Sequence, residues 1–131
     1  MKDKEDGKLP EKHPTTRLST MPRDTNPSGD IFGGWIMSQV DIAGAIVAME
    51  RAGGEVATVA VNAFEFREPV FVGDLVSCYA KVTKVGNTSI TVDVEVYAQR
   101  NPGKPLTVKV TEAILTYVAL DENRRPRHIS K

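Results

Sequence analysis

The sequence predicts an α+β protein in which one long helix packs against one antiparallel sheet. A helix-like segment at residues 33–51 is followed by four strand-like segments with no second helix between them. Residues 90–96 alternate between aliphatic and polar side chains, as expected of a strand with one buried face. Successive strands joined by turns pair antiparallel, and the single helix must cover their apolar face.

The helix is predicted by the spacing of its apolar residues and by its end signals. No proline interrupts the segment, and about nineteen residues at roughly 1.5 Å each give a rod about 28 Å long. Gly53 and Gly54 follow as a stop signal, and Asp30 precedes the helix, where an anionic side chain is favourable. The apolar residues at helical spacing are Ile36, Val40, Ala43 and Val47.

The strands are predicted by runs of β-branched and aromatic residues bounded by turn residues. Gly86 and Asn87 are a hairpin signal, and wider turns are expected at 69–73 and 101–105. A short first strand is expected at 17–21, followed by long strands at 55–66, 74–85, 88–99 and 106–120.

Length and composition indicate one globular domain at residues 17–120, between a flexible N-terminal tail (1–16) and a polar C-terminal tail (121–131). The 40% hydrophobic and 26% charged content is ordinary for a soluble protein. No apolar stretch is long enough to span a bilayer, and the charged N-terminus lacks the features of a signal peptide. We therefore expect a cytoplasmic protein.

Charge and motifs exclude several function classes. The 17 basic and 17 acidic residues cancel, so neither nucleic acid nor an anionic membrane is an expected partner. The chain has no G-x-S-x-G motif, nucleotide-binding glycine motif or paired Cys and His ligands, and we expect no metal site. His13 and His128 lie in the predicted tails, which argues against a Ser-His-Asp hydrolase. Cys78, the single cysteine, is interpreted as a buried, inert thiol.

Asp41 is the residue of the helix that composition does not explain. It is the only ionisable residue between Asp30 and Glu50, and aspartate is a poor residue for the middle of a helix. The residues alone leave three interpretations open: a functional carboxylate, a hydrogen-bonded aspartate at a subunit contact, or an exposed side chain. Its neighbours at helical spacing are small or apolar: Gly34, Met37, Ser38, Gly44, Ala45 and Ala48.

Three stretches resemble the hotdog acyl-CoA thioesterases of the YciA type. They read MPRDTNPSGDIFGGWIMSQVDIAGAIVAME, VAVNAFEFREPVFVGDLVSCYAKVTKVGNTSITVDVEV and TEAILTYVALDENRRP, and they cover nearly all of the chain except the N-terminal tail. The resemblance implies a hotdog fold, in which a curved antiparallel sheet wraps around one long central helix. It also implies a dimer with joined sheets as the catalytic unit, and a hexamer built as a trimer of dimers.

The resemblance further implies hydrolysis of acyl-CoA thioesters to free acid and CoA, with Asp41 as the catalytic carboxylate. Asp41 would act as a general base on water or attack directly to form an anhydride. Amide groups at the helix N-terminus, near Gly33 and Gly34, would form the oxyanion hole. Close packing of helix on sheet is an equally good explanation of this glycine pair. No cofactor is expected, because coenzyme A is part of substrate and product.

Asn26 and Asp30 are further candidate catalytic residues, which would orient water or substrate. Related double-hotdog thioesterases often have Asn where Asp30 stands, and an aspartate could serve there only as an acceptor. The residues alone favour an Asx turn at Asn26 and a helix cap at Asp30.

Binding of the CoA moiety is assigned to a turn and two basic residues. Arg67 and Lys84 could bind the CoA phosphates, although ordinary surface charges are the more frequent case. The turn offers hydroxyl and amide groups, but a plain hairpin needs no ligand. Its residues are Gly86, Asn87, Thr88 and Ser89.

Two other functions remain open: a non-catalytic acyl-CoA binding module and a β-rich oligomeric interaction domain. A sensor would need an attached output domain, for which 131 residues leave no room. One helix about 10 Å wide cannot cover the whole face of a long-stranded sheet, so a homo-oligomer is expected.

Overall fold

The computed structural model describes residues 7–131, without the side chains of Ala63 and Phe64. Residues 1–6 of the predicted N-terminal tail lie outside the described residues. The described elements are β1 (Thr16–Ser19), the 3-10 turn η2 (Pro22–Asp24), α1 (Gly33–Ala52), β2 (Val56–Phe66), β3 (Leu75–Val85), β4 (Ser89–Arg100) and β5 (Leu106–Ala119). The predicted helix and strands are confirmed, with ends shifted by a few residues.

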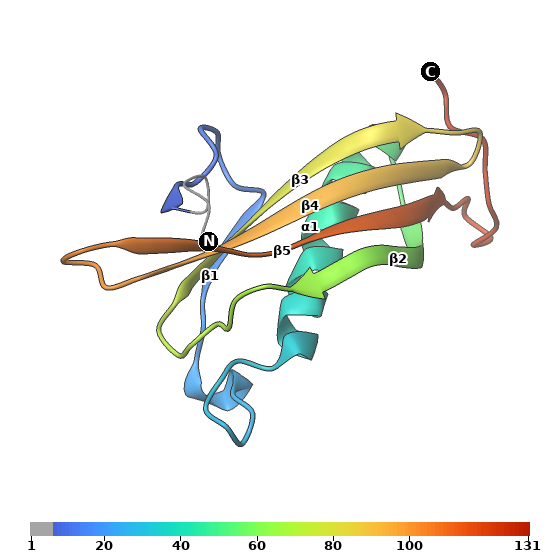
Figure 1. Cartoon of the computed structure of the whole chain (residues 1–131). Helices are drawn as coiled ribbons and strands as arrows, with labels where there is room; N and C mark the ends of the chain where they lie inside the picture. The colour runs from blue at the N-terminus through green and yellow to red at the C-terminus, as the bar shows by residue number, and fades with distance from the viewer. Residues whose placement is uncertain (1–6) are drawn as a thin grey trace.

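The five strands form one antiparallel sheet in the order β1-β3-β4-β5-β2, with α1 lying across one face (Figure 1). The helix separates β1 from β2 in the sequence, and these two strands become the opposite edges of the sheet. β2 pairs with β5 through an irregularity between Thr58 and Ala60. Such a bulge bends a strand and changes the direction of its side chains.

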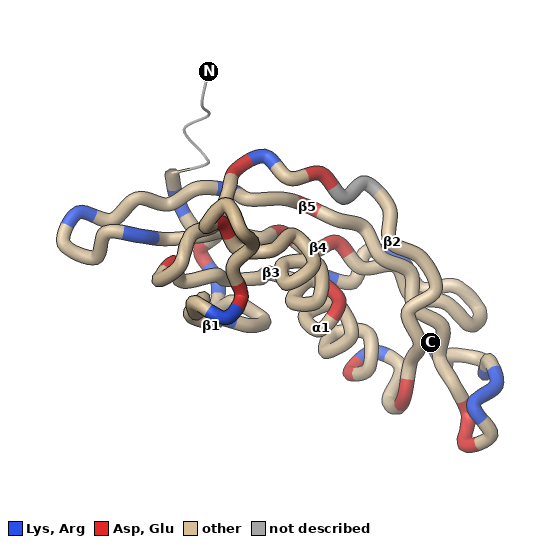
Figure 2. The backbone as a smooth tube through the Cα atoms, turned by 90° about the horizontal axis from the view of Figure 1, so that it is seen from below, with Lys and Arg blue, Asp and Glu red and all other residues tan. Residues whose placement is uncertain are grey.

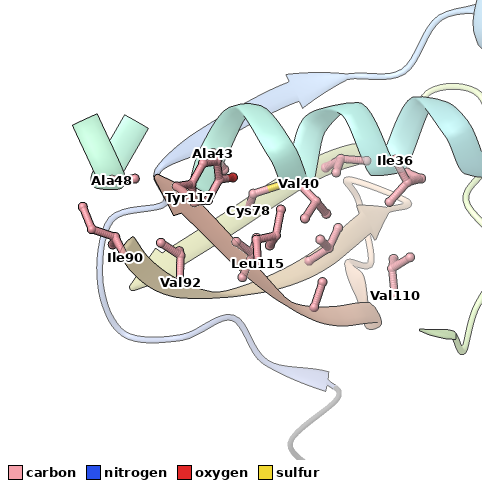
Figure 3. Packing of buried hydrophobic residues seen from close by; sticks show 14 of the residues in the cluster. Ile36, Val40, Ala43, Ala48, Cys78, Ile90, Val92, Val110, Leu115 and Tyr117 are labelled. Carbon is pink, nitrogen blue, oxygen red and sulfur yellow. The ribbon is translucent and has the colours of Figure 1, made fainter. Parts of the chain in front are cut away.

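The core lies between α1 and the face of the sheet that it covers (Figure 3). Along β4 the aliphatic side chains are fully buried while the polar side chains between them are only partly buried, as the alternation predicted. Burial of each such aliphatic side chain contributes roughly 1.5–3 kcal/mol. Fully buried residues from three elements are Val40 and Ala43 of α1, Ile90, Val92, Val94 and Val96 of β4, and Leu115 and Tyr117 of β5.

The two ends of α1 differ in how their backbone groups are satisfied. Phe32 is the N-cap and makes no side-chain capping bond, so the interpretation of Asp30 as the helix cap is wrong. Asp30 lies two residues earlier and pairs through its backbone with Phe71. At the other end, Gly53 has a left-handed conformation with φ of 72° and donates to Met49 O. Arg127 Nη2 donates to Ala52 O at 2.6 Å.

The C-terminal segment, predicted to be a polar tail, packs against the domain. Ile129 is 1% exposed, and its N–H donates to Asn87 O at 2.8 Å. The end of the predicted N-terminal tail also joins the sheet, since Thr15 N–H donates to Cys78 O at 2.8 Å. Charged residues of both signs are interspersed along the chain (Figure 2). Within residues 7–131, no helix has the length and apolar character needed to cross a membrane.

A buried ion pair holds the loop between β2 and β3. Asp74 is 2% exposed and forms two hydrogen bonds with Arg100, at 2.8 and 3.1 Å. Asp74 also accepts the N–H of Phe71 at 2.9 Å, and Thr20 Oγ1 donates to Phe71 O at 2.8 Å. The loop is therefore fixed where it approaches the start of α1.

Candidate functional site

Asp41 is half-buried on α1, and its carboxylate is held by two hydroxyl groups from the sheet. Thr58 Oγ1 donates to Asp41 Oδ1 at 2.7 Å, and the phenolic oxygen of Tyr117 lies 3.1 Å from the same oxygen. The Tyr117 hydroxyl also lies 2.8 Å from the main-chain oxygen of Asp41. Of the three interpretations of Asp41, the structure excludes a side chain that is simply exposed.

Tyr117 reaches Asp41 through a gap that a glycine leaves in the helix. Tyr117 is fully buried beneath α1 (Figure 3). A Cβ atom at Gly44 would lie 2.2 Å from the phenolic oxygen, so no larger residue fits without moving the ring. Burial and then the charge of Asp41 raise the pKa of Tyr117, which keeps the phenol protonated.

Sequence reasoning did not identify Thr58 or Tyr117 as site residues. They are directly opposed in the pairing of β2 with β5, although the two strands lie far apart in the chain. The available signal was Gly44, three residues after Asp41 in a stripe of small residues.

A cavity of about 330 Å³ lies at the N-terminus of α1. It brings together four of the predicted site residues, Asn26, Asp30, Gly33 and Arg67. Its lining residues are Asn26, Asp30, Ile31, Gly33, Ile36, Phe66, Arg67, Glu68, Pro69 and Val70.

The side chain of Asn26 organises the loop beside this cavity. Its Oδ1 accepts the N–H groups of Ser28 at 2.9 Å and Asp30 at 3.1 Å, which confirms the predicted Asx turn. These two N–H donors show which side-chain atom of Asn26 is the oxygen, so the other atom is the amide nitrogen, Nδ2. That Nδ2 group donates to no acceptor among the described residues and remains available to a ligand.

The first amides of α1 are also available to a ligand. Phe32 O accepts the first helical bonds, from Trp35 and Ile36. The N–H groups of Gly33 and Gly34 donate to no acceptor in residues 7–131, as expected for a helix N-terminus. The packing explanation applies to Gly33, where a Cβ would lie 3.1 Å from the Phe66 ring, but not to Gly34, where the space is open.

In one protomer, Asp41 and the cavity are separate. Asp41 follows Gly33 by eight residues, which is about 12 Å along the helix axis. Asp41 is not among the residues that line the cavity. A single chain therefore does not place Asp41 and the free amides of Gly33 and Gly34 around one carbonyl group.

The predicted CoA-binding residues also lie apart from one another. Arg67 is beside the cavity, whereas the β3–β4 turn lies at the opposite end of the domain, near the C-terminal segment. In this turn, Gly86 N–H donates to Ser89 O at 2.8 Å, and Thr88 O accepts the N–H of Ala119 at 2.9 Å. Lys84 is exposed just before this turn, and Asn87 is exposed within it. The bond from Gly86 to Ser89 is that of an ordinary hairpin, and the bond from Ala119 joins the turn to β5.

A second group of charged residues lies on the face of the sheet that α1 does not cover. Lys109 Nζ lies 3.3 Å from Glu95 and 3.1 Å from Glu112. Asp93 adjoins them, and its buried Oδ1 has no hydrogen-bond partner among the described residues. Burial, followed by the charge of Glu112, raises the pKa of Asp93 to about 6. Burial is the largest single influence on Glu112 and acts to raise its pKa, but the hydrogen bond and charge of Lys109 with the smaller effects of Asp93 and Arg67 together lower that pKa.

We expect Asp93→Asn to stabilise the protein at neutral pH. Since the pKa of Asp93 rises from 3.8 to about 6 on folding, the native state binds the extra proton between these values and loses stability as pH rises through them. Asparagine does not ionise, so the variant does not lose this stability as the pH rises. Urea unfolding at pH 7.5 should show a gain of about 1 kcal/mol, allowing for solvent screening, and a smaller gain at pH 4.5. Equal stability of both proteins at both values would contradict the assignment.

Comparison with known proteins identifies the family. Residues 28–103 match the family model of the Thioesterase superfamily, and the chain belongs to this family. An acyl-CoA thioester hydrolase of Buchnera aphidicola subsp. Schizaphis graminum, described as uncharacterized, is 52% identical over 124 residues, covering 93% of this chain and 92% of the relative. The acyl-CoA thioester hydrolase YciA of Salmonella typhimurium is 50% identical over 113 residues, 85% of each chain. The predicted resemblance is therefore confirmed.

Solved structures confirm the hotdog fold. A hexameric hotdog fold thioesterase of Campylobacter jejuni has a TM-score of 0.87 and 49% identity, covering 91% of both chains. An acyl-CoA hydrolase of Staphylococcus aureus has a TM-score of 0.78 and 30% identity, covering 87% of this chain and 69% of that one. The structures of this hydrolase include one mutant with an aspartate and one with a threonine replaced by alanine.

Proposed function

We propose that this protein hydrolyses acyl-CoA thioesters to the free acid and coenzyme A. The observation that carries the proposal is Asp41, a half-buried carboxylate held by Thr58 and Tyr117 in a chain of the thioesterase family. The Salmonella typhimurium relative is an acyl-CoA thioester hydrolase, which supports the same substrate class here.

Asp41 supplies the base or the nucleophile. As a base, it takes a proton from water while the water oxygen attacks the thioester carbonyl. As a nucleophile, it attacks the carbonyl itself, releases CoA as the thiolate and forms an anhydride that water then cleaves. In both routes the carbonyl oxygen becomes negative, and the N–H groups of Gly33 and Gly34 stabilise it at the positive end of the helix dipole. This chemistry requires no cofactor.

Asn26 supplies a further donor at the same end of the helix. Its free Nδ2 group can hydrogen-bond the substrate carbonyl or the attacking water beside the cavity, while its Oδ1 keeps the loop in shape. Asp30, also in the lining of the cavity, can accept a hydrogen bond from water. These roles complete the catalytic set predicted from the sequence.

The catalytic unit is a dimer in this proposal. Asp41 and the free amides of Gly33 and Gly34 are separated by about 12 Å in one chain, so two chains must combine them. β2 is an edge strand, and exposed apolar residues lie along it and along α1. Pairing of this face with its copy about a two-fold axis would cover them and bring one helix N-terminus toward the partner's Asp41. The exposed residues include Phe32, Met37, Ile42, Val59 and Val61.

A homohexamer made of three such dimers is the proposed assembly, since the Campylobacter jejuni thioesterase is hexameric. Within this assembly, Arg67 can bind a CoA phosphate beside the cavity of its own chain. Lys84 and the turn containing Gly86, Asn87, Thr88 and Ser89 would reach the CoA of a neighbouring subunit.

The Staphylococcus aureus hydrolase provides separate support for pairing Asp41 with Thr58. The aspartate and threonine replaced in its mutants are 17 residues apart, the same separation as between Asp41 and Thr58. We take the two positions to correspond.

The proposal is tested by measuring thiol release from a panel of saturated acyl-CoA substrates, from acetyl-CoA to palmitoyl-CoA. We expect release of CoA and free acid in equal amounts from at least one chain length. Tight binding of acyl-CoA without thiol release at any length would favour the non-catalytic binding module. Asp93→Asn serves as a control, because its side chain lies on the other face of the sheet and its turnover should equal that of the wild type.

A further inference from the structure

We propose that Tyr117 is a positioning residue that, together with Thr58, holds Oδ1 of Asp41 and so makes Oδ2 the oxygen that reacts. This inference rests on the proposed function, and it adds one residue and one atom assignment to it.

Both hydroxyl groups bind the same carboxylate oxygen. Thr58 and Tyr117 are directly opposed residues of β2 and β5, next to the irregularity in β2. Their oxygen atoms lie 2.7 and 3.1 Å from Asp41 Oδ1, whereas Oδ2 accepts no hydrogen bond from the described residues. The terminal torsion of a free aspartate is broad. Two donors on one oxygen restrict it and leave the lone pairs of Oδ2 for water or the thioester carbon.

Gly44 makes this contact geometrically feasible. The gap between helix and ring is narrow, since a Cβ at this position would lie 2.2 Å from the Tyr117 oxygen and 3.0 Å from the adjacent ring carbon. Tyr117 is fully buried, so its hydroxyl is shielded from water and directed at one turn of the helix. The absence of a side chain at Gly44 therefore allows the Tyr117 hydroxyl to reach Asp41.

The Tyr117 hydroxyl can serve both protonation states of Asp41. It carries one proton and has two acceptors, the main-chain oxygen at 2.8 Å and Oδ1 at 3.1 Å. A bond to the ionised carboxylate is charge-assisted and therefore stronger than a bond between neutral groups. When Asp41 holds a proton during turnover, the Tyr117 hydroxyl can donate its hydrogen bond to the main-chain oxygen of Asp41 alone. Thr58 is uncharged, and Asp41 is the only charged group in the described residues that acts on the pKa of Tyr117.

The test is Tyr117→Phe, which removes the hydroxyl and keeps the ring. We expect kcat to fall about ten- to a hundredfold, as for loss of one hydrogen bond to a charged group, with KM changed less than about threefold. The fall in kcat should be seen when Asp41 is present and not in the Asp41→Asn background. A purely structural role of Tyr117 would lower the rate equally in both backgrounds.

Tyr97→Phe is the matched control. Tyr97 is also a buried tyrosine whose hydroxyl contacts a carboxylate, Glu95 at 3.3 Å, but on the other face of the sheet. Its variant should retain the wild-type kcat and KM. Gly44→Ala should lower both thermal stability and kcat, because the new Cβ displaces the Tyr117 hydroxyl. Adding Tyr117→Phe to Gly44→Ala should restore part of the stability and none of the turnover.

Asp41→Asn, measured in parallel, tests the proposed function separately from the role of Tyr117. Loss of turnover in Asp41→Asn together with wild-type kcat in Tyr117→Phe would overturn the role of Tyr117 and leave the proposed function standing. Wild-type turnover in Asp41→Asn would overturn both. In the Asp41→Asn background, Tyr117→Phe should cause no further loss, because the two side chains act as one unit.

Discussion

Asp41→Asn is expected to lower kcat for acyl-CoA hydrolysis by at least about a hundredfold, since a positioned base or nucleophile contributes about 10²–10⁴ to the rate. The asparagine side chain has the same shape, and its oxygen can still accept from Thr58 and Tyr117. The oligomer should therefore survive. Single-substrate kinetics, with size-exclusion chromatography of the same sample, measures both outcomes.

The control for this substitution is Asp93→Asn, which removes one negative charge at a position remote from α1. It should keep the wild-type kcat. Equal rates for the wild type and Asp41→Asn would remove Asp41 from the mechanism. A loss of rate that accompanies dissociation of the oligomer would instead assign Asp41 to the subunit contact, the second interpretation of this residue.

Gly34→Pro is expected to lower kcat by about a hundred- to a thousandfold, because it removes an N–H group from the proposed oxyanion hole. Proline is tolerated in the first turn of a helix, where the missing N–H has no helical partner. Gly34 also has open space around it, so the ring meets no neighbouring atom at the Cβ position. Circular dichroism and thermal unfolding of the variant should show a folded protein.

Gly34→Ala shows whether activity depends on the N–H group of Gly34 or on the absence of a side chain there. Alanine keeps the amide and places its methyl group in open space, so this variant should retain activity within about threefold. If Gly34→Ala and Gly34→Pro lost activity equally, the requirement would be for a small residue at the subunit contact and not for an amide donor.

The positions of the strands and helix were predictable because each depends on a pattern of residues close together in the sequence. The helix was expected at 33–51 and is found at Gly33–Ala52, ending at the predicted glycine. The alternation at 90–96 placed its aliphatic residues in the core. The helix cap at Asp30 was not correct, because a favourable residue type near a helix start does not decide which residue turns first. Ile129 was missed for a related reason: one apolar residue in a polar segment has no periodicity to reveal it.

The site was predictable only in part. Asp41 stands out because a lone carboxylate on a small, apolar helix face is unusual, whereas the glycine pair is a weak signal that close packing explains equally well. Asn26, Asp30, Gly33 and Arg67 line one cavity, and their chemical roles stay predictions. Thr58 and Tyr117 were not found, since the one available signal, Gly44, marks a close approach to the helix and does not show which residue makes it.

Local patterns of apolar, glycine and charged residues thus account for the secondary structure, the single helix on a sheet and the identity of the unusual carboxylate. Tertiary structure decided which hydroxyl groups hold that carboxylate and which of its oxygen atoms is left free. The reason is that β2 and β5 are neighbours only after the sheet forms, and the 2.7 and 3.1 Å contacts depend on that register and on the gap at Gly44.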